Sequence, residues 1–526
     1  MKIEIISGDS RRSLEYEAPV LLSSVFAEHG VPVEMPCGGR QRCLKCRVKA
    51  SGALSPMNDR ERELLGEEAV QAGYRYACMT TALGDVTVTL PKKDKSDRIV
   101  TAGDMADFAL KPWGEGYGAA VDIGTTTVAL YLYRLADGEL VGTASERNPQ
   151  APFGADVISR IECSMAGDAP KLAEMIRSCL ARMLKSACAS GGVGMDEVSS
   201  LVLTGNTAML YLLTGKSPLS IAKAPFEQDT YFGEFLRPEE LELPLKPEAR
   251  VYLPRCISAY VGADITTALM AAGFDRRKAG DEAALLVDIG TNGEMALAAG
   301  DRLLCCSTAA GPAFEGAGIY QGMNAKEGAI SKVALEGETI TCQVIGGGPA
   351  KGICGSGIVD AVAAMVRTGI LDPTGVINEE DHPFTDCITE ADDQVAFRLP
   401  GTQVVITQKD IRSIQLAKSA ICAGMTTLIG EAGLQPEDVK RLYIAGGFGA
   451  FIDVRSAECI GLIPPGFAAK AKAIGNAAGA GASMVLLGDE VRIGAEQLSR
   501  EAETIELSSS PRFMDAYVEN MLFGEE

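Results

Sequence analysis

The sequence has few of the residues that most metal and acid–base sites use, and no long apolar run. It contains only two histidines, His29 and His382, so imidazole-rich zinc or copper sites and histidine-based catalysis have almost no candidates. No stretch of about 20 apolar residues is present, which excludes an ordinary membrane-spanning helix. The N-terminus lacks the apolar segment of roughly 7–15 residues that follows a basic start in a signal peptide. We therefore expect a cytoplasmic protein with no membrane partner.

An excess of positive charge is also missing. The chain has 49 Lys and Arg against 70 Asp and Glu, a formal net charge of −21. Binding to nucleic acids or to anionic membrane surfaces requires a basic face, so we expect neither. Hydrophobic residues make up 47% of the 526 residues. At about 100–200 residues per domain, this length and composition predict three or four packed domains.

Cysteine, by contrast, is plentiful, with 15 residues. In a reducing compartment these are thiols or metal ligands. Cys37, Cys43 and Cys46 form a C-x5-C-x2-C pattern, and Cys78 follows in the segment YACMT. Four thiolates in this arrangement favour an iron–sulfur cluster. The alternatives are a structural zinc site, which usually shows two C-x2-C pairs where this chain has one, or unrelated core thiols.

Residues 1–92 resemble a [2Fe–2S] ferredoxin domain of the β-grasp fold. The cysteine spacing carries this resemblance, together with alternating polar and apolar residues at 2–6 and strand patterns at 47–50 and 85–90. The resemblance implies that the cluster ligands are Cys37, Cys43, Cys46 and Cys78.

Two later segments share a second pattern, in which an apolar strand ends in a carboxylate and a Gly-Thr turn follows. Residues 121–127 read VDIGTTT and residues 287–293 read VDIGTNG. The N–H groups and hydroxyls of such a turn can hold phosphate oxygens, and the carboxylate can hold Mg²⁺ directly or through water. Two copies predict two related subdomains that face a cleft.

A third segment, YIAGGFG at residues 443–449, runs from a strand into glycines that let a base and ribose lie on bare backbone. Together the three segments resemble the acetate and sugar kinase, Hsp70 and actin superfamily, whose two ribonuclease-H-like subdomains clamp ATP. The alternative is a degenerate fold that keeps the turns without ATP. The resemblance implies that ATP is held by two phosphate turns and an adenosine turn: Asp122, Gly124, Thr125 and Thr126; Asp288, Gly290, Thr291 and Asn292; Gly446, Gly447 and Gly449.

Glu315 is the candidate catalytic residue. It lies in the glycine-rich stretch AAGPAFEGAG at residues 309–318, which can line the nucleotide cleft. It could orient the attacking water, or it could serve as an ion-pair partner or a cap. A second glycine-rich stretch, at residues 346–357, could line the cleft too. No catalytic Asp beside a small-molecule pocket is identified.

These observations predict an α/β multidomain chain. Residues 1–92 form the ferredoxin-like domain, and 93–118 are a linker or, alternatively, an extra helix packed on a neighbour. Residues 119–199 form a first ribonuclease-H-like subdomain, which could be a reduced unit that serves dimerisation. Residues 200–526 form the actin/Hsp70/sugar-kinase-type ATPase domain.

A [2Fe–2S] domain followed by this ATPase resembles the reductive activators of corrinoid-dependent methyltransferases. Local matches support the resemblance: NPQ at 148–150, GADV at 154–157, GNTAM at 205–209 and GSG at 355–357. It implies that one electron passes from the cluster to the inactive Co(II) corrinoid of a partner protein, regenerating Co(I), at the expense of ATP and with Mg²⁺. It also implies a low-potential ferredoxin- or flavodoxin-type donor, a homodimer and anaerobic conditions.

The corrinoid should belong to the partner, because neither histidine lies in an Asp-x-His-x-x-Gly corrinoid-binding motif. Three other functions remain open at this point. They are an ATP-dependent activator of another low-potential reductase or dehydratase, a redox-gated small-molecule kinase, and an Hsp70-like binding module without electron flow.

Overall fold

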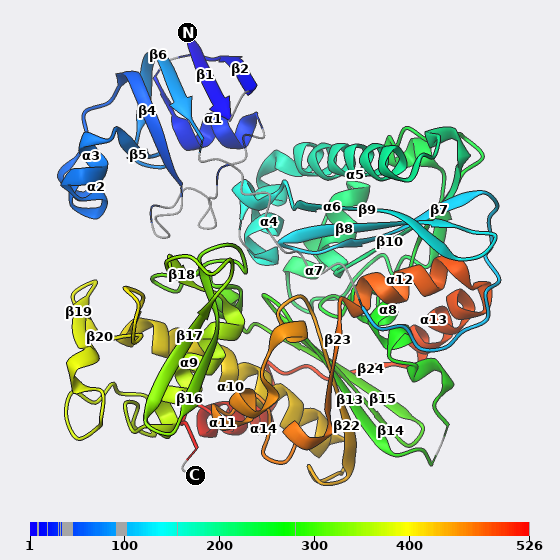
Figure 1. Ribbon diagram of the computed structural model, residues 1–526. Helices are drawn as coiled ribbons and strands as arrows, with labels where there is room; N and C mark the ends of the chain where they lie inside the picture. The colour runs from blue at the N-terminus through cyan, green and yellow to red at the C-terminus, as the bar shows by residue number, and fades with distance from the viewer. Residues whose placement is uncertain are drawn as a thin grey trace.

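The computed structural model describes residues 1–7, 10–17, 19–29, 31, 33, 41, 46–90, 103–154, 156–278 and 280–524. These residues build three six-stranded sheets and two three-stranded sheets. The first six-stranded sheet belongs to a small N-terminal domain, which Figure 1 shows in blue. The other two six-stranded sheets belong to the two halves of a larger body.

The N-terminal sheet has the strand order β2-β1-β6-β4-β5, with β3 paired to β6. Strand β1 runs parallel to β6, and its alternation places Ile3 and Ile5 in the core beneath α1. This arrangement confirms the predicted β-grasp fold. The elements are β1 (Lys2–Ser7), β2 (Ser10–Glu15), β3 (Val20–Leu21), α1 (Leu22–Glu28), β4 (Arg47–Leu54), α2 (Asp59–Leu65), α3 (Glu67–Gln71), β5 (Tyr74–Tyr76) and β6 (Thr81–Thr89).

The second sheet has the order β11-β12-β10-β7-β8-β9. An antiparallel meander, β7 to β9, continues into parallel strands β10 and β12. Helix α5, whose apolar residues recur at helical spacing, packs on β8 and β9. The strands are β7 (Tyr117–Ile123), β8 (Thr127–Arg134), β9 (Glu139–Arg147), β10 (Val198–Gly205), β11 (Glu234–Leu236) and β12 (Arg250–Leu253), and the helices are α4 (Val157–Cys163), α5 (Ala169–Gly191), α6 (Thr207–Thr214), α7 (Leu219–Ala222) and α8 (Ala263–Ala271).

The third sheet, β23-β22-β13-β14-β15-β24, repeats this plan. Its meander β13 to β15 joins parallel strands β22 and β23, as β7 to β9 joins β10 and β12. The two VDIG segments therefore occupy equivalent places in two related halves, as predicted. The strands are β13 (Ala283–Ile289), β14 (Gly293–Ala299), β15 (Arg302–Thr308), β22 (Val439–Ala445), β23 (Ala471–Gly475) and β24 (Glu503–Thr504).

The second half also carries two small sheets, β17-β16-β18 and β19-β20-β21, which Figure 1 shows beside α9 and α10. Their strands are β16 (Ala329–Glu336), β17 (Thr339–Val344), β18 (Gly352–Ile353), β19 (Ile388–Ala391), β20 (Gln394–Arg398) and β21 (Val405–Thr407). The remaining helices are α9 (Gly355–Arg367), α10 (Gln408–Glu431), α11 (Val454–Cys459), α12 (Ala477–Leu487), α13 (Asp489–Glu501) and α14 (Pro511–Glu519).

Helix α12 joins the two halves. It packs against α8 and against β7 and β10 of the first half, although it follows β23 of the second (Figure 1). At the crossing, a Cβ atom added to Gly481 would lie 1.7 Å from the carbonyl oxygen of Thr267, so only glycine allows this approach. One buried cluster contains side chains of both sheets and both helices.

Two sequence-based boundaries look different in the structure. The border predicted at 199/200 falls inside β10, which pairs with β7 along its whole length, so the first half continues past it. Of the segment predicted as linker, residues 103–116 form no helix. They run along the body, where the backbone N–H of Asp104 bonds Ile474 O at 3.0 Å and Trp113 Nε1 bonds Val485 O at 3.0 Å. Residues 93–102 lie outside the described part.

Candidate functional site

The two VDIG turns face each other across one cavity of about 300 Å³ between the two halves. The cavity brings together residues that are far apart in the chain. Of the residues predicted to hold ATP, ten line it: Asp122, Gly124, Thr125, Thr126, Asp288, Gly290, Thr291, Asn292, Gly446 and Gly447. Gly449 does not line the cavity.

The first turn (residues 124–126) connects β7 to β8. Gly124 closes it by donating its N–H to Thr127 O at 2.9 Å. A Cβ atom on residue 124 would lie 2.7 Å from that same oxygen, so a side chain here would push the strands apart. The hydroxyl of Thr125 accepts a hydrogen bond from Asn206 Nδ2 at 3.1 Å, which ties the turn to the start of α6.

The second turn (residues 290–292) connects β13 to β14, and Gly290 donates its N–H to Asn292 O at 3.0 Å, one residue nearer than in the first turn. The adenosine turn predicted after β22 lies next to it. Gly446 has a φ of +95°, and a Cβ there would lie 2.7 Å from Asp288 Oδ1. Gly449 lies behind this turn, where a Cβ would meet Ile444 Cγ2 at 2.8 Å. Residue 449 is glycine because its backbone packs closely against β22, and not because it faces the cavity.

Glu315 bridges the two turns. It ends a short 3-10 helix, η6 (Pro312–Glu315), and its carboxylate reaches into the cavity. Thr126 Oγ1 donates to Glu315 Oε2 at 2.7 Å, and Thr291 Oγ1 donates to Glu315 Oε1 at 2.7 Å. The structure therefore places the predicted catalytic residue between the hydroxyls of both turns, one from each half of the body.

Four further carboxylates lie against the cavity, and burial perturbs all of them. Burial raises the pKa of Asp122 to about 6, although the Asn476 amide opposes the shift. Burial and the charges of Asp122 and Glu315 raise the pKa of Asp288 to about 7. Burial together with Asp122 and Asp288 raises the pKa of Asp264 to about 8. Burial also raises the pKa of Glu294 well above its usual range, with Asp264 and Asp288 adding to it.

Such a group of buried carboxylates suits a cation, because a nearby positive charge relieves both burial and mutual repulsion. Among the described residues, however, no three Asp, Glu, Cys or His side chains converge closely enough to hold a metal ion by themselves. Mg²⁺ commonly uses one or two carboxylates and takes its other ligands from water and substrate phosphates. The residues present therefore fit Mg²⁺ that arrives with a nucleotide.

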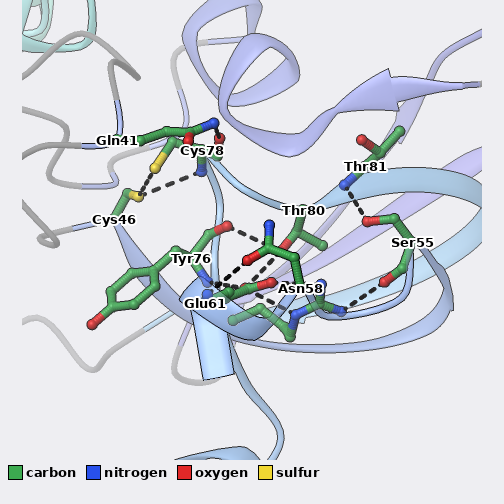
Figure 2. A network of polar contacts seen from close by, with 10 residues as sticks. Gln41, Cys46, Ser55, Asn58, Glu61, Tyr76, Cys78, Thr80 and Thr81 are labelled. Atoms are coloured by element: carbon green, nitrogen blue, oxygen red, sulfur yellow. Dashed lines mark hydrogen bonds and ion pairs between the residues drawn. The ribbon is translucent and has the colours of Figure 1, made fainter. Parts of the chain in front are cut away.

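The N-terminal domain brings two of the predicted cluster ligands together. The sulfurs of Cys46 and Cys78 lie 3.2 Å apart, and the Cys78 N–H points at Cys46 Sγ at 3.4 Å (Figure 2). Both thiols are buried, at 1% exposure. Two adjacent sulfurs with a backbone N–H directed at one of them fit a thiolate-ligated cluster. Cys37 and Cys43 lie outside the described residues.

A buried ion pair supports the segment that carries Cys78. Glu61 is 0% exposed and accepts from Arg75 Nε at 3.0 Å and Arg75 Nη2 at 2.9 Å. The same carboxylate accepts from the Tyr76 N–H at 2.9 Å and from Thr80 Oγ1 at 3.1 Å, as Figure 2 shows. Glu61 therefore holds the Tyr76 backbone before Cys78 and the Thr80 hydroxyl after it, although nothing in the local sequence distinguishes it from other acidic residues of α2.

Known proteins show the same organisation along the whole chain. Residues 117–277 match the family profile described as "RACo middle region", and residues 282–526 match "C-terminal domain of RACo the ASKHA domain". The chain is 32% identical to the corrinoid activation enzyme RamQ of Eubacterium limosum, over 96% of both chains. It belongs to this family of corrinoid activation proteins.

Two further similarities agree with this family. The chain is 27% identical, over 68% of both chains, to the [Co(II) methylated amine-specific corrinoid protein] reductase of Methanosarcina barkeri. A solved structure described as a reductive activator for corrinoid,iron-sulfur protein superposes with a TM-score of 0.71 at 28% identity, over 99% of this chain and 98% of that one. The predicted family and fold class are thus confirmed. Within the described residues, no helix has the length and apolarity that crossing a membrane requires.

The family profiles divide the body between 277 and 282, where the structure passes from its first half to its second.

Sequence reasoning also missed several cavity residues. Asn206 and Asn476 each follow the last glycine of a strand and cap the next helix, accepting from Met209 N and Gly479 N at 2.9 Å each. The repeated Gly-Asn pair before an apolar helix is a capping signal that could have identified both. Asp264, at the start of α8, carries no comparable signal.

Proposed function

We propose that this corrinoid activation protein uses ATP to drive one electron from an iron–sulfur cluster in residues 1–92 onto the Co(II) corrinoid of a partner protein, which regenerates Co(I). The observation that carries the proposal is the Glu315 bridge between two phosphate-type turns, in a chain that also holds paired buried thiols in a ferredoxin-like domain. The two turns fit the binding and hydrolysis of ATP, and the paired thiols fit electron transfer.

In this proposal the cluster is of the [2Fe–2S] type, with Cys37, Cys43, Cys46 and Cys78 as its ligands. When bound, it supplies the single electron that Co(II) accepts. The described residues of the domain contribute the position of Cys78, which the Glu61 carboxylate fixes through Arg75 and the Tyr76 N–H. They also bury the sulfurs, and burial and N–H bonds to sulfur are what tune the potential of such a cluster.

At the nucleotide site, the N–H groups and hydroxyls of the two turns would hold the phosphates of ATP. Gly446 and Gly447 would accept the adenosine, and Asp122 and Asp288 would hold Mg²⁺, directly or through water. Glu315 would orient the attacking water, because it already lies between Thr126 and Thr291. We also propose that the electron donor is a low-potential ferredoxin or flavodoxin. The protein would be a homodimer and would lie in the cytoplasm.

ATP can support an unfavourable electron transfer only by shifting an equilibrium between states that bind it differently. A one-electron potential changes by about 59 mV for each tenfold difference in affinity between two states. Glu315 joins the two halves of the cleft through the hydroxyls of Thr126 and Thr291. Nucleotide phosphates would compete with Glu315 for these hydroxyls. The states with and without the Glu315 bridge should therefore differ in their affinity for ATP. Binding of ATP would thus alter how the halves are held together.

The test is an anaerobic mixture of the reduced protein with a Co(II) corrinoid protein, observed by visible spectroscopy with and without Mg-ATP. We expect Co(I) to form only when ATP is present. A Cys78→Ser variant should hydrolyse ATP without forming Co(I), and a Thr126→Val/Thr291→Val double variant should keep its cluster spectrum but lose the ATP effect. Co(I) formation that is independent of ATP would contradict the proposal, as would phosphorylation of a small molecule in its place.

A further inference from the structure

The back of the first turn is held by three hydrogen bonds from polar side chains and backbone of the first half. Asn148, directly after β9, donates Nδ2 to Gly124 O at 2.8 Å and its backbone N–H to Thr126 O at 2.9 Å. Arg160 of α4 donates Nη2 to Thr125 O at 2.6 Å. All three successive carbonyls of the turn are therefore engaged by residues that do not line the cavity, which places these bonds at the back of the turn.

This engagement decides which groups of the turn face the cavity. The N–H and C=O of one peptide point in opposite directions, so a carbonyl that is held at the back directs its neighbouring N–H forward. Carbonyl oxygens at the front would repel phosphate, whereas N–H groups there attract it. The bonds from Asn148 and Arg160 thus favour the orientation that an anion requires.

Arg160 also places a positive charge behind the turn. Its side chain is 1% exposed, and its Nε donates to Gly154 O at 3.0 Å. Burial lowers the pKa of Arg160 to about 10, with Asp156 and Glu315 opposing the shift, so the guanidinium stays charged near neutral pH. A lysine would keep the charge, but its single nitrogen could not reach both carbonyls as the planar guanidinium does.

We propose that Arg160 and Asn148 are positioning residues of the nucleotide site, which hold the first turn with its N–H groups toward the phosphates and supply a buried positive charge behind them. This inference rests on the proposed binding of ATP in the cleft. It also gives a role to the NPQ segment at 148–150 and to the GADV segment at 154–157, which ends at the start of α4.

The experiment compares Arg160→Lys with a matched control, Arg177→Lys, in the full-length protein. Arg177 belongs to the same half, and its Nε also donates to a backbone carbonyl, Leu213 O at 2.9 Å, away from the turn. Titration of a non-hydrolysable ATP analogue with Mg²⁺ should show affinity at least about tenfold weaker for Arg160→Lys and unchanged for Arg177→Lys. The affinity for adenosine, which has no phosphate, should not change in either variant.

Chemical rescue separates positioning from general damage to the fold. In Arg160→Ala, millimolar guanidinium should restore part of the affinity for the ATP analogue, whereas the same concentration of ammonium should not. Asn148→Ser, which loses the Nδ2 bond to Gly124 O, should weaken binding in a way that is not additive with Arg160→Lys, because both act on one turn.

Equal affinity of Arg160→Lys and the parent protein for the ATP analogue would overturn the inference, as would equal losses for adenosine and the analogue. Either result would leave the proposed function standing, provided that the parent protein binds the analogue. Failure of the parent protein itself to bind ATP would refute the proposed function instead.

Discussion

Replacing Glu315 by glutamine should make the protein bind ATP more tightly and hydrolyse it more slowly. In the structure both carboxylate oxygens of Glu315 accept threonine hydroxyls, each at 2.7 Å. Glutamine keeps the shape of the side chain, but its NH₂ group cannot accept a hydrogen bond. In Glu315→Gln one threonine hydroxyl still donates to the amide oxygen, and the other can only accept from the amide NH₂, so two bonds to a charged group become two bonds between neutral groups.

The expected size follows from the energies of such bonds. A hydrogen bond to a charged group stabilises by about 1.5–3 kcal/mol and a neutral one by about 0.5–1.5 kcal/mol. The bridge should thus weaken by about 2–3 kcal/mol. Phosphates that bind the hydroxyls of Thr126 and Thr291 must break these hydrogen bonds, so breaking them should cost that much less. Since a negative charge is also removed from the phosphate site, affinity for ATP should rise about tenfold or more.

Hydrolysis should fall in the same variant, by about a hundredfold or more, if Glu315 orients or deprotonates the attacking water. Affinity is measured by calorimetry with a non-hydrolysable ATP analogue and Mg²⁺, and hydrolysis by phosphate release. Glu336→Gln, which alters an exposed glutamate at the end of β16, is the control. Weaker binding of the analogue together with unchanged hydrolysis would refute both the competition and the catalytic role.

Three other expectations follow from single positions. Gly447→Ala should leave the melting temperature unchanged, because its Cβ meets nothing within 4 Å. The added methyl group should enter the nucleotide space and weaken ATP binding about tenfold or more. Gly348→Ala is the control, because a Cβ there also meets nothing within 4 Å. Glu61→Gln should speed release of iron to a chelator relative to Glu63→Gln, because it leaves Arg75 as a buried cation without its charged partner, which costs about 3–5 kcal/mol. Burial lowers the pKa of Lys418 to about 8, so the unfolded chain binds more protons between pH 8 and about 10.4, and stability should rise with pH there. Lys418→Met should remove a rise of about 2–3 kcal/mol, seen as a smaller change in melting temperature between pH 7.5 and 10; equal pH dependence in both proteins would count against it.

The positions of the two turns could be predicted because each depends on a short segment. A strand, a carboxylate and a glycine within seven residues determine each turn, so 121–127 and 287–293 could be placed from their patterns alone. The apolar spacing of α5 determined its buried face in the same way. Glu315 was found because it lies in a glycine-rich stretch, but its bridge to Thr126 and Thr291 depends on the packing of two halves and had no local signature.

The residues that were missed act across long separations. Arg160 reaches the first turn from 35 residues away, and Asn476 bonds Tyr131 Oη across 345 residues. Their side chains are buried polar groups, which a pattern of apolar spacing does not reveal. The border at 199/200 failed to separate two units for a related reason. Only the tertiary fold shows that β10, which spans this border, lies beside β7.

The distribution of charge gives the cavity a direction. The guanidinium of Arg160 lies behind the first turn, whereas burial and the charges of Asp264 and Asp288 raise the pKa of Glu294 beside the second. Arg160 therefore favours an anion at the first turn. The buried carboxylates favour a cation, and they come from both halves: Asp122 and Asp264 from the first, Asp288 and Glu294 from the second. We expect a phosphate to be drawn toward the backbone of the first turn, and Mg²⁺ toward these carboxylates, of which Asp122 and Asp288 lie on the two facing strands.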